Sequence, residues 1–102
     1  MSAPFEIRLS EGVKDDLNGL RAYDRHMILD AIEAQLTHEP NVATKRHKLL
    51  HNLTPPFEAT LPIWQLRVGA FRVFYDVQNE ERRVYVRAIR RKPPHRNTEE
   101  IL

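Results

Sequence analysis

The chain has no cysteine, and no part of its 102 residues forms a long apolar run. Without cysteine it has neither disulfide bonds nor thiolate ligands for a metal ion. No stretch approaches the ~20 consecutive apolar residues of a membrane-spanning helix, so we expect no membrane partner. The first residues, MSAPFEIRLS, carry charges where a signal peptide has an apolar segment. We therefore expect a cytoplasmic protein that forms a single domain over residues 1–102.

Acidic residues become scarce toward the C-terminus. Residues 1–40 hold eight acidic and four basic residues, a net charge of −4, whereas residues 41–102 hold six acidic and twelve basic residues, a net charge of +6. Residues 82–98 contain seven Lys or Arg and no Asp or Glu. Such a segment suits a polyanionic partner such as a nucleic acid, although basic segments also serve merely to keep proteins soluble.

Glycine is scarce as well, and one of the three glycines marks a turn within residues 64–77, WQLRVGAFRVFYDV. A Gly69-Ala70 turn with glycine first is typical of a type II′ hairpin. Counting outward from this turn pairs Arg67 with Arg72, and strand alternation places both on one face of the sheet. The same register predicts four further pairs: Val68 with Phe71, Leu66 with Val73, Gln65 with Phe74, and Trp64 with Tyr75.

A third strand is predicted over residues 82–90, after a polar four-residue loop at residues 78–81 that pairs Val77 with Arg82. This register predicts a row of three arginines across the strands with two aromatic rings beside it: Arg67, Arg72 and Arg87, with Phe74 and Tyr85. Like charges that face each other destabilise a sheet, so we expect an anion such as a phosphate on this face. The alternative is an ordinary polar face in contact with water.

The rest of the chain predicts a short strand and two helices. Residues 5–9 alternate between apolar and charged side chains, as a half-buried strand does. Ser10 is expected to cap a first helix over residues 11–20. A second helix is expected over residues 23–38, where apolar residues recur every fourth position until Pro40. The two helices form a hairpin that can cover one face of the sheet.

The segments around the sheet are less regular. Residues 41–62 are expected to form a loop with one short strand near residues 57–59, because several prolines interrupt it. After Pro93 and Pro94 a terminal helical turn is expected, capped by Thr98. The order is β-α-α-β-β-β. It predicts an α+β domain with an antiparallel sheet of about four strands and an N-terminal helical hairpin packed on one face.

The first strand, the helical hairpin and residues 64–77 together resemble the RelE/ParE superfamily of bacterial toxins. LRVGAFRVFYDV is similar to the LRxGxYRxxY signature of that superfamily, and the resemblance covers nearly the whole chain. It implies a RelE-like fold and the toxin component of a type II toxin-antitoxin system. The implied partners are a small antitoxin protein, the ribosome and mRNA, with operator DNA as a further partner of the toxin-antitoxin complex.

The resemblance points to the RelE-like branch, whose members cut mRNA in the ribosomal A site. In that reaction the RNA 2′-hydroxyl attacks the neighbouring phosphate, and no metal or other cofactor takes part. Arg72 matches the arginine of the family hairpin, and Arg67 belongs to the same signature. The basic residue that members carry after the final strand falls on Arg91 or Lys92, and His95 or Arg96 is a substitute for the tyrosine that members often have after it. The resemblance thus implies four catalytic residues: Arg67, Arg72, Lys92 and His95.

The expected RNA-binding residues are basic or aromatic: Lys45, Arg46, Lys48, Phe74, Tyr85, Arg87, Arg90 and Arg91. Glu58 is a further candidate base. The plain structural alternative for Arg72 is a salt bridge with Asp76 or Glu58. His47 and His51 have the spacing of neighbours on a helix, but no HExxH motif and no third ligand accompany them, so we expect no metal site. Core positions are expected for three aromatic residues of the hairpin: Trp64, Phe71 and Tyr75.

Two departures from the family pattern favour a different function. Ile63 and Gln65 stand where well-known RelE members have lysines, and residues 97–99 lack the tyrosine often found there. The alternative is therefore a non-catalytic binding protein, either a ParE-like inhibitor of DNA gyrase or a degenerate toxin that binds only its antitoxin and operator DNA.

Overall fold

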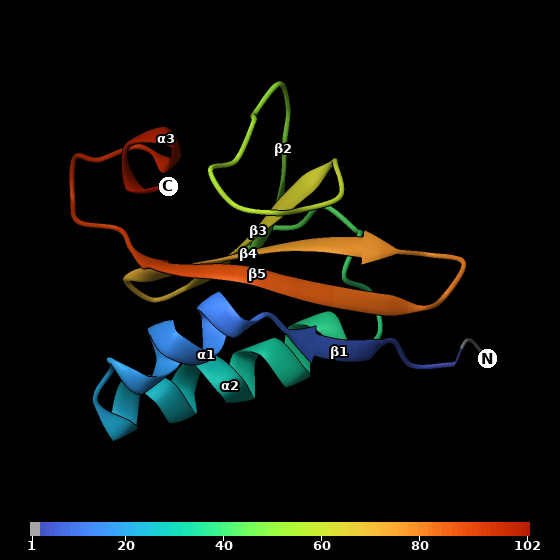
Figure 1. Cartoon of the computed structure of the whole chain (residues 1–102), viewed down its shortest axis with the longest axis horizontal. Helices are drawn as coiled ribbons and strands as arrows, with labels where there is room; N and C mark the ends of the chain where they lie inside the picture. The colour runs from blue at the N-terminus through green and yellow to red at the C-terminus, as the bar shows by residue number, and fades with distance from the viewer. Residues whose placement is uncertain (1–2) are drawn as a thin grey trace.

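A computed structural model describes residues 3–102 as one five-stranded sheet with a helical hairpin on one face (Figure 1). The strands are β1 (Glu6–Leu9), β2 (His47–Leu50), β3 (Ile63–Val68), β4 (Phe71–Gln78) and β5 (Arg83–Arg91), and the helices are α1 (Glu11–Asn18), α2 (Ala22–Leu36) and α3 (Thr98–Ile101). The spatial strand order is β1-β5-β4-β3-β2, with β1 parallel to β5 and all other pairs antiparallel. The predicted α+β class is confirmed.

The helical hairpin forms as the apolar spacing predicts. Ser10 caps α1, since its Oγ accepts a hydrogen bond from the backbone N–H of Val13 at 3.2 Å. Both helices end two residues before their predicted ends, α1 at Asn18 and α2 at Leu36. The helices bury five apolar side chains against the sheet: Val13, Leu17, Ile28, Ile32 and Leu36. Trp64, Phe71 and Tyr75 pack in the same cluster, as predicted.

The β3–β4 hairpin has the predicted register. Arg67 lies opposite Arg72, and the four other predicted pairs are also confirmed. Gly69 adopts a φ of +57°, a backbone conformation that a side chain disfavours. A single glycine in the turn is therefore enough to fix which residues face each other.

Replacement of Gly69 by alanine should destabilise the fold by about 1–2 kcal/mol, because a Cβ atom strains left-handed backbone. The cost comes from the backbone and not from a clash, since an added Cβ would lie 3.8 Å from Cε of Met27. Gly12 lies inside α1 with ordinary backbone angles, and Gly12→Ala should stabilise the fold by about 0.5–1 kcal/mol. Urea unfolding of both variants tests this, and equal effects of the two changes would contradict it.

The predicted register of β5 is wrong. Val77 pairs with Val84 instead of Arg82, because the turn spans residues 79–82 and is closed by a 3.1 Å hydrogen bond from the N–H of Arg82 to the carbonyl of Asn79. Farther along, the ladder shifts by one residue at a β-bulge, and Arg87 is left out of the pairing. Arg90, and not Arg87, therefore lies opposite Arg72.

The middle of the sheet face away from α1 and α2 is covered by other segments of the chain. The segment between β2 and β3 and the C-terminal helix α3 lie on this side (Figure 1). Three buried side chains of the sheet pack there against five apolar residues of these segments and of β2: Ile63, Phe74 and Ala88 against Leu50, Phe57, Ala59, Ile101 and Leu102. The domain thus has a second, smaller apolar cluster.

Two predictions on these covering segments are wrong. Residues 57–59 form no strand, whereas His47–Leu50 pairs with β3 as β2. Asn97 caps α3 in place of Thr98: the side chains of Asn97 and Glu100 each accept a hydrogen bond from the other's backbone N–H. Thr98 instead donates its hydroxyl proton to Gln65 at 2.7 Å, which ties α3 to β3. Among residues 3–102, no helix is both long and apolar enough to cross a membrane.

Candidate nucleic-acid interface

Arg67 and Arg72 lie opposite each other next to the hairpin turn. Nη1 of Arg72 donates hydrogen bonds to the carbonyl oxygens of Gly69, at 2.9 Å, and of Phe71, at 2.8 Å. These bonds hold the guanidinium of Arg72 against the turn and leave its other nitrogens for a ligand. The planar fork of an arginine matches two oxygens of a phosphate group.

The positive charges of this pair are not neutralised. Neither Arg67 nor Arg72 forms a salt bridge within residues 3–102, so Arg72 is not held by Asp76 or Glu58. Burial lowers the pKa of Arg72, and the positive charge of Arg67 lowers it further. The guanidinium stays charged, because arginine does not lose its proton in proteins. An anion bound between the two arginines would relieve this repulsion.

Arg90 extends the arginine pair to a third strand, but its charge is partly satisfied. Nη1 of Arg90 lies 3.0 Å from a carboxylate oxygen of Asp16 on α1. Arg91 lies against the helical side of the sheet, with its guanidinium 4.6 Å from the Phe71 ring centre and 3.9 Å from the carboxylate of Asp24. Both arginines therefore help to hold β5 against the helical hairpin.

The predicted position of Arg87 in the arginine row is wrong. Nε of Arg87 lies 2.6 Å from the carboxylate of Asp76, which is fully buried, and the Arg87 side chain is only 15 % exposed. The same carboxylate accepts a hydrogen bond from the backbone N–H of Thr60 at 3.1 Å. Arg87 thus belongs to a buried ion pair that anchors the segment before β3.

The two aromatic residues expected to stack on bases lie in different surroundings. Phe74 is 0 % exposed inside the second apolar cluster, so a base cannot reach it and that prediction is wrong. Tyr85 is partly exposed, but the guanidinium of Arg87 lies 4.6 Å from its ring centre. One face of Tyr85 is therefore already occupied.

Two of the three predicted acid and base candidates, Lys92 and His95, follow β5. The backbone N–H of Lys92 donates to the carbonyl of Ala70 at 2.7 Å, which brings Lys92 beside the turn that carries Arg72. His95 is exposed and follows the two prolines, with a φ of +69°. Glu58 is exposed on the segment before β3 and forms no hydrogen bond to either arginine of the pair. Lys92 is thus the candidate nearest to the arginine pair along the backbone.

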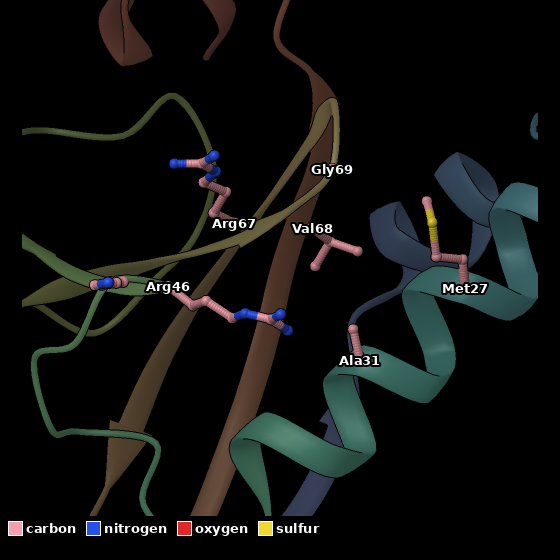
Figure 2. Close-up of a pocket in the computed structure, with 7 residues that line it drawn as sticks. Met27, Ala31, Arg46, Arg67, Val68 and Gly69 are labelled. Atoms are coloured by element: carbon pink, nitrogen blue, oxygen red, sulfur yellow. The ribbon is translucent and has the colours of Figure 1, made fainter.

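Lys45 and Arg46 add two further cations on the other side of Arg67. The backbone N–H of Arg67 donates to the carbonyl of Arg46 at 2.9 Å. Both residues line a cavity of about 500 Å³ that also includes Arg67 and is shown in Figure 2. Lys48 lies elsewhere, on a separate hollow beside α3. Lys45 and Arg46 were predicted from the basic composition of residues 41–62. The cavity could not be predicted from that composition, because α2 forms one of its walls.

His47 and His51 are not arranged as metal ligands. His47 is 5 % exposed in β2, whereas His51 is exposed in the turn that follows. Among the residues that the structure describes, no group of three or more His, Asp or Glu side chains could hold a metal ion. Nδ1 of His47 lies 3.3 Å from Oγ1 of Thr44, and Nε2 is buried without a hydrogen-bond partner within residues 3–102.

His47 should make the fold less stable in mild acid. Burial lowers the pKa of His47, and the charge of Arg46 adds to this, although the nearby backbone of Val42 opposes it. Below about pH 6.5 the unfolded chain therefore binds more protons than the folded one, and the free energy of unfolding decreases as the pH falls. Urea unfolding at about pH 7.5 and about pH 5.5 measures this dependence.

His47→Gln should reduce that pH dependence. The matched control His26→Gln, at an exposed position of α2, should leave it intact. A pH dependence that is the same in both variants would contradict the role of His47.

The fold is similar to that of chains in two solved toxin-antitoxin complexes. A structure of the toxin-antitoxin complex RelBE2 from Mycobacterium tuberculosis matches with a TM-score of 0.68 and 19 % identity, covering 87 % of this chain and 99 % of that one. An archaeal RelE-RelB complex from Pyrococcus horikoshii matches with a TM-score of 0.67 and 20 % identity, covering 91 % of this chain and 98 % of that one. No curated protein matches the sequence significantly.

A family model described as the ParE toxin of the type II toxin-antitoxin system parDE matches residues 7–92. This match begins inside β1 and covers the helical hairpin and strands β2 to β5, including the hairpin that carries Arg67 and Arg72. The chain therefore belongs to the ParE toxin family within the RelE/ParE superfamily, and it is a toxin of a type II toxin-antitoxin system.

Proposed function

We propose that this toxin is a metal-independent, ribosome-dependent mRNA endonuclease. The observation that supports it most is the opposed pair Arg67 and Arg72, which carries two positive charges without a carboxylate partner within residues 3–102. Like charges directly opposite each other destabilise a sheet, and an anion bound between them relieves the repulsion. The scissile phosphate of an mRNA is such an anion.

The reaction needs no metal if the arginines stabilise the transition state. The 2′-oxygen of the RNA attacks the adjacent phosphorus and loses its proton to a base, while the 5′-oxygen leaves and takes up a proton from an acid. Charge accumulates on the phosphate oxygens as the fifth bond forms, and fixed donors lower the energy of that state. Arg72 is held by the carbonyls of Gly69 and Phe71, so its position costs little reorganisation during the reaction.

The proton transfers are assigned to the segment after β5. Lys92 begins this segment beside the turn, and His95 follows on an exposed loop. Both side-chain types act as general acids or bases in other enzymes. The ribosome would bring the mRNA into place and order this segment around it.

The partners follow from the same proposal. The two similar solved structures are toxin-antitoxin complexes, which supports a small antitoxin protein as the partner of this chain. The ribosome and mRNA are the proposed targets, the proposed location is the cytoplasm, and the complex with the antitoxin would bind operator DNA. No cofactor is required.

The second candidate is inhibition of DNA gyrase without cleavage of RNA. The matching family model bears the description of the ParE toxin, which favours this reading. Under it, the arginine pair would contact DNA or an acidic protein surface, and Lys92 and His95 would have no catalytic role.

Expression of the chain in cells under an inducible promoter distinguishes the two functions. The proposal expects growth arrest together with new mRNA 5′ ends inside coding regions, in register with codons. Growth arrest with double-stranded DNA breaks and no new mRNA ends would contradict the proposal and favour gyrase. Absence of growth arrest would favour a degenerate toxin.

A further inference from the structure

A carboxylate of α1 lies at the edge of β5, next to the strand end that carries Arg90. β1 pairs with β5 as far as Val86, and beyond this point α1 takes the place of a neighbouring strand. Oδ2 of Asp16 accepts a hydrogen bond from the backbone N–H of Ile89 at 3.1 Å, and the same oxygen lies 3.0 Å from Nη1 of Arg90. Asp16 thus binds the edge of β5 and neutralises part of the charge of Arg90.

Arg90 stands where its side chain can reach an anion held by the arginine pair. It lies directly opposite Arg72 on one adjacent strand, as Arg67 does on the other, so the three side chains share one face of the sheet. Adjacent strands are about 4.8 Å apart, a spacing that the long side chain of an arginine spans. The Arg90 side chain is 34 % exposed, and its Nε and Nη2 donate no hydrogen bond within residues 3–102. These two donors are therefore available to a phosphate.

We propose that Asp16 restrains the affinity of the chain for RNA by holding Arg90, and that Arg90 exchanges this carboxylate for a phosphate when RNA binds. This inference rests on the RNA-binding part of the proposed function. A guanidinium pairs with a carboxylate or a phosphate through the same donors, so the two anions compete for Arg90. Both side chains of the ion pair are about one-third exposed, and breaking such a pair costs little. Without RNA, the carboxylate of Asp16 offsets the third positive charge of the row.

Asp16→Asn tests the proposal, because the asparagine oxygen can still accept the N–H of Ile89 while the negative charge is lost. The probe is a short, fluorescently labelled oligouridylate, titrated with the purified chain over a range of salt concentrations. We expect Asp16→Asn to bind this RNA about two- to fivefold more tightly than the unchanged chain, the range that corresponds to one partly exposed ion pair. The matched control is Asp15→Asn, which removes the same charge at the neighbouring exposed position, where no ion pair forms within residues 3–102. It should bind nearly as the unchanged chain does.

A double-mutant cycle assigns the gain to Arg90. Arg90→Gln should weaken RNA binding and make the dependence of log K on log salt shallower by about 0.7, the change for one lost phosphate contact on a single strand. In the Arg90→Gln chain, the further change Asp16→Asn should give no gain, because the competing anion then has no guanidinium to hold. Equal binding by Asp16→Asn and Asp15→Asn, or a gain that persists with Arg90→Gln, would overturn the proposal. Weaker binding by Asp16→Asn would also overturn it, since Asp16 would then serve only to hold β5 in place.

Two further measurements separate RNA from a protein ligand, and this inference from the proposed function. A gain in Asp16→Asn that is larger for a polyglutamate peptide than for the oligouridylate would assign Arg90 to an acidic protein surface and overturn the proposal. If the chain binds RNA as expected but cuts no mRNA on ribosomes, the nuclease fails while the role of Asp16 in RNA binding stands. If the chain cuts mRNA but Asp16→Asn binds RNA as Asp15→Asn does, the role of Asp16 fails while the nuclease stands.

Discussion

Arg72→Ala should lower the rate of mRNA cleavage by about 10²–10³-fold, the loss seen when one fixed donor to a developing negative charge is removed. Arg72 is partly buried beside the turn and has no carboxylate partner within residues 3–102, so its charge is available to the phosphate. Arg72→Lys should also be slow, because an ammonium group lacks the planar fork. Single-turnover cleavage of mRNA on ribosomes measures both effects.

Arg72→Ala should leave the stability of the fold nearly unchanged. Removal of Arg72 breaks its hydrogen bonds to the carbonyls of Gly69 and Phe71 at the molecular surface, which costs at most about 1 kcal/mol, and it also ends the repulsion with Arg67. The matched control is Arg8→Gln, which removes an arginine from β1 at the other end of the strand order. It should cut at the rate of the unchanged chain. If Arg8→Gln and Arg72→Ala reduce cleavage equally, the effect is one of total charge and the assigned role of Arg72 is wrong.

Asp76→Ala should destabilise the fold by about 3–5 kcal/mol, the usual cost of removing one partner from a buried ion pair. Asp76 is fully buried, and without it Arg87, whose side chain is only 15 % exposed, has no counter-ion. The backbone N–H of Thr60 also loses its acceptor, so the segment before β3 should detach first. Urea unfolding measures the loss, and faster hydrogen exchange at Thr60 would locate it.

Two further variants show whether the loss of stability in Asp76→Ala comes from the unpaired charge of Arg87 or from lost packing. Replacing both partners with apolar residues, Asp76→Leu with Arg87→Met, should recover much of the stability, because no buried charge is then left unpaired. Glu6→Ala breaks the pairs of the exposed Glu6 with Arg8 and Arg83 and should cost no more than about 1 kcal/mol. A cost for Asp76→Ala as small as that for Glu6→Ala would contradict the structural role of the buried pair.

The parts of the fold that depend on local rules could be predicted from the sequence. One glycine in the β3–β4 turn fixes the register of that hairpin, and so the opposed arginines were predicted correctly. The helices followed from apolar residues at helical spacing, and Ser10 marked the start of α1. These features need no information on distant residues.

The register of β5 could not be predicted in the same way. The turn between β4 and β5 contains no glycine or proline that would indicate which residues form it. Arg82 adopts a left-handed backbone conformation, with a φ of +51°, although it is not a glycine. The bulge at Arg87 is stabilised by the buried carboxylate of Asp76, a contact on a neighbouring strand. The displaced turn and the bulge together shift the register of β5. Arg90 therefore lies opposite Arg72, where the sequence predicted Arg87.

The cavity and the second apolar cluster also depend on tertiary packing. Met27 and Gly69 are far apart in the sequence, and only the packing of α2 against the hairpin brings them together. Phe74 has the alternation of an exposed position, but residues 51–62 and α3 cover it. A face that looks polar in a single strand can thus be buried by segments that the strand pattern does not describe.

Cleavage of ribosome-bound mRNA by the purified toxin tests directly whether Arg72 serves a nuclease. The unchanged chain, Arg72→Ala and Arg8→Gln would each be added to programmed ribosomes without divalent ions beyond those that the ribosome needs, and the 5′ ends would be mapped. We expect defined cuts by the unchanged chain and by Arg8→Gln, and their loss in Arg72→Ala. Intact mRNA with all three proteins, together with inhibition of purified gyrase by the unchanged chain, would contradict it.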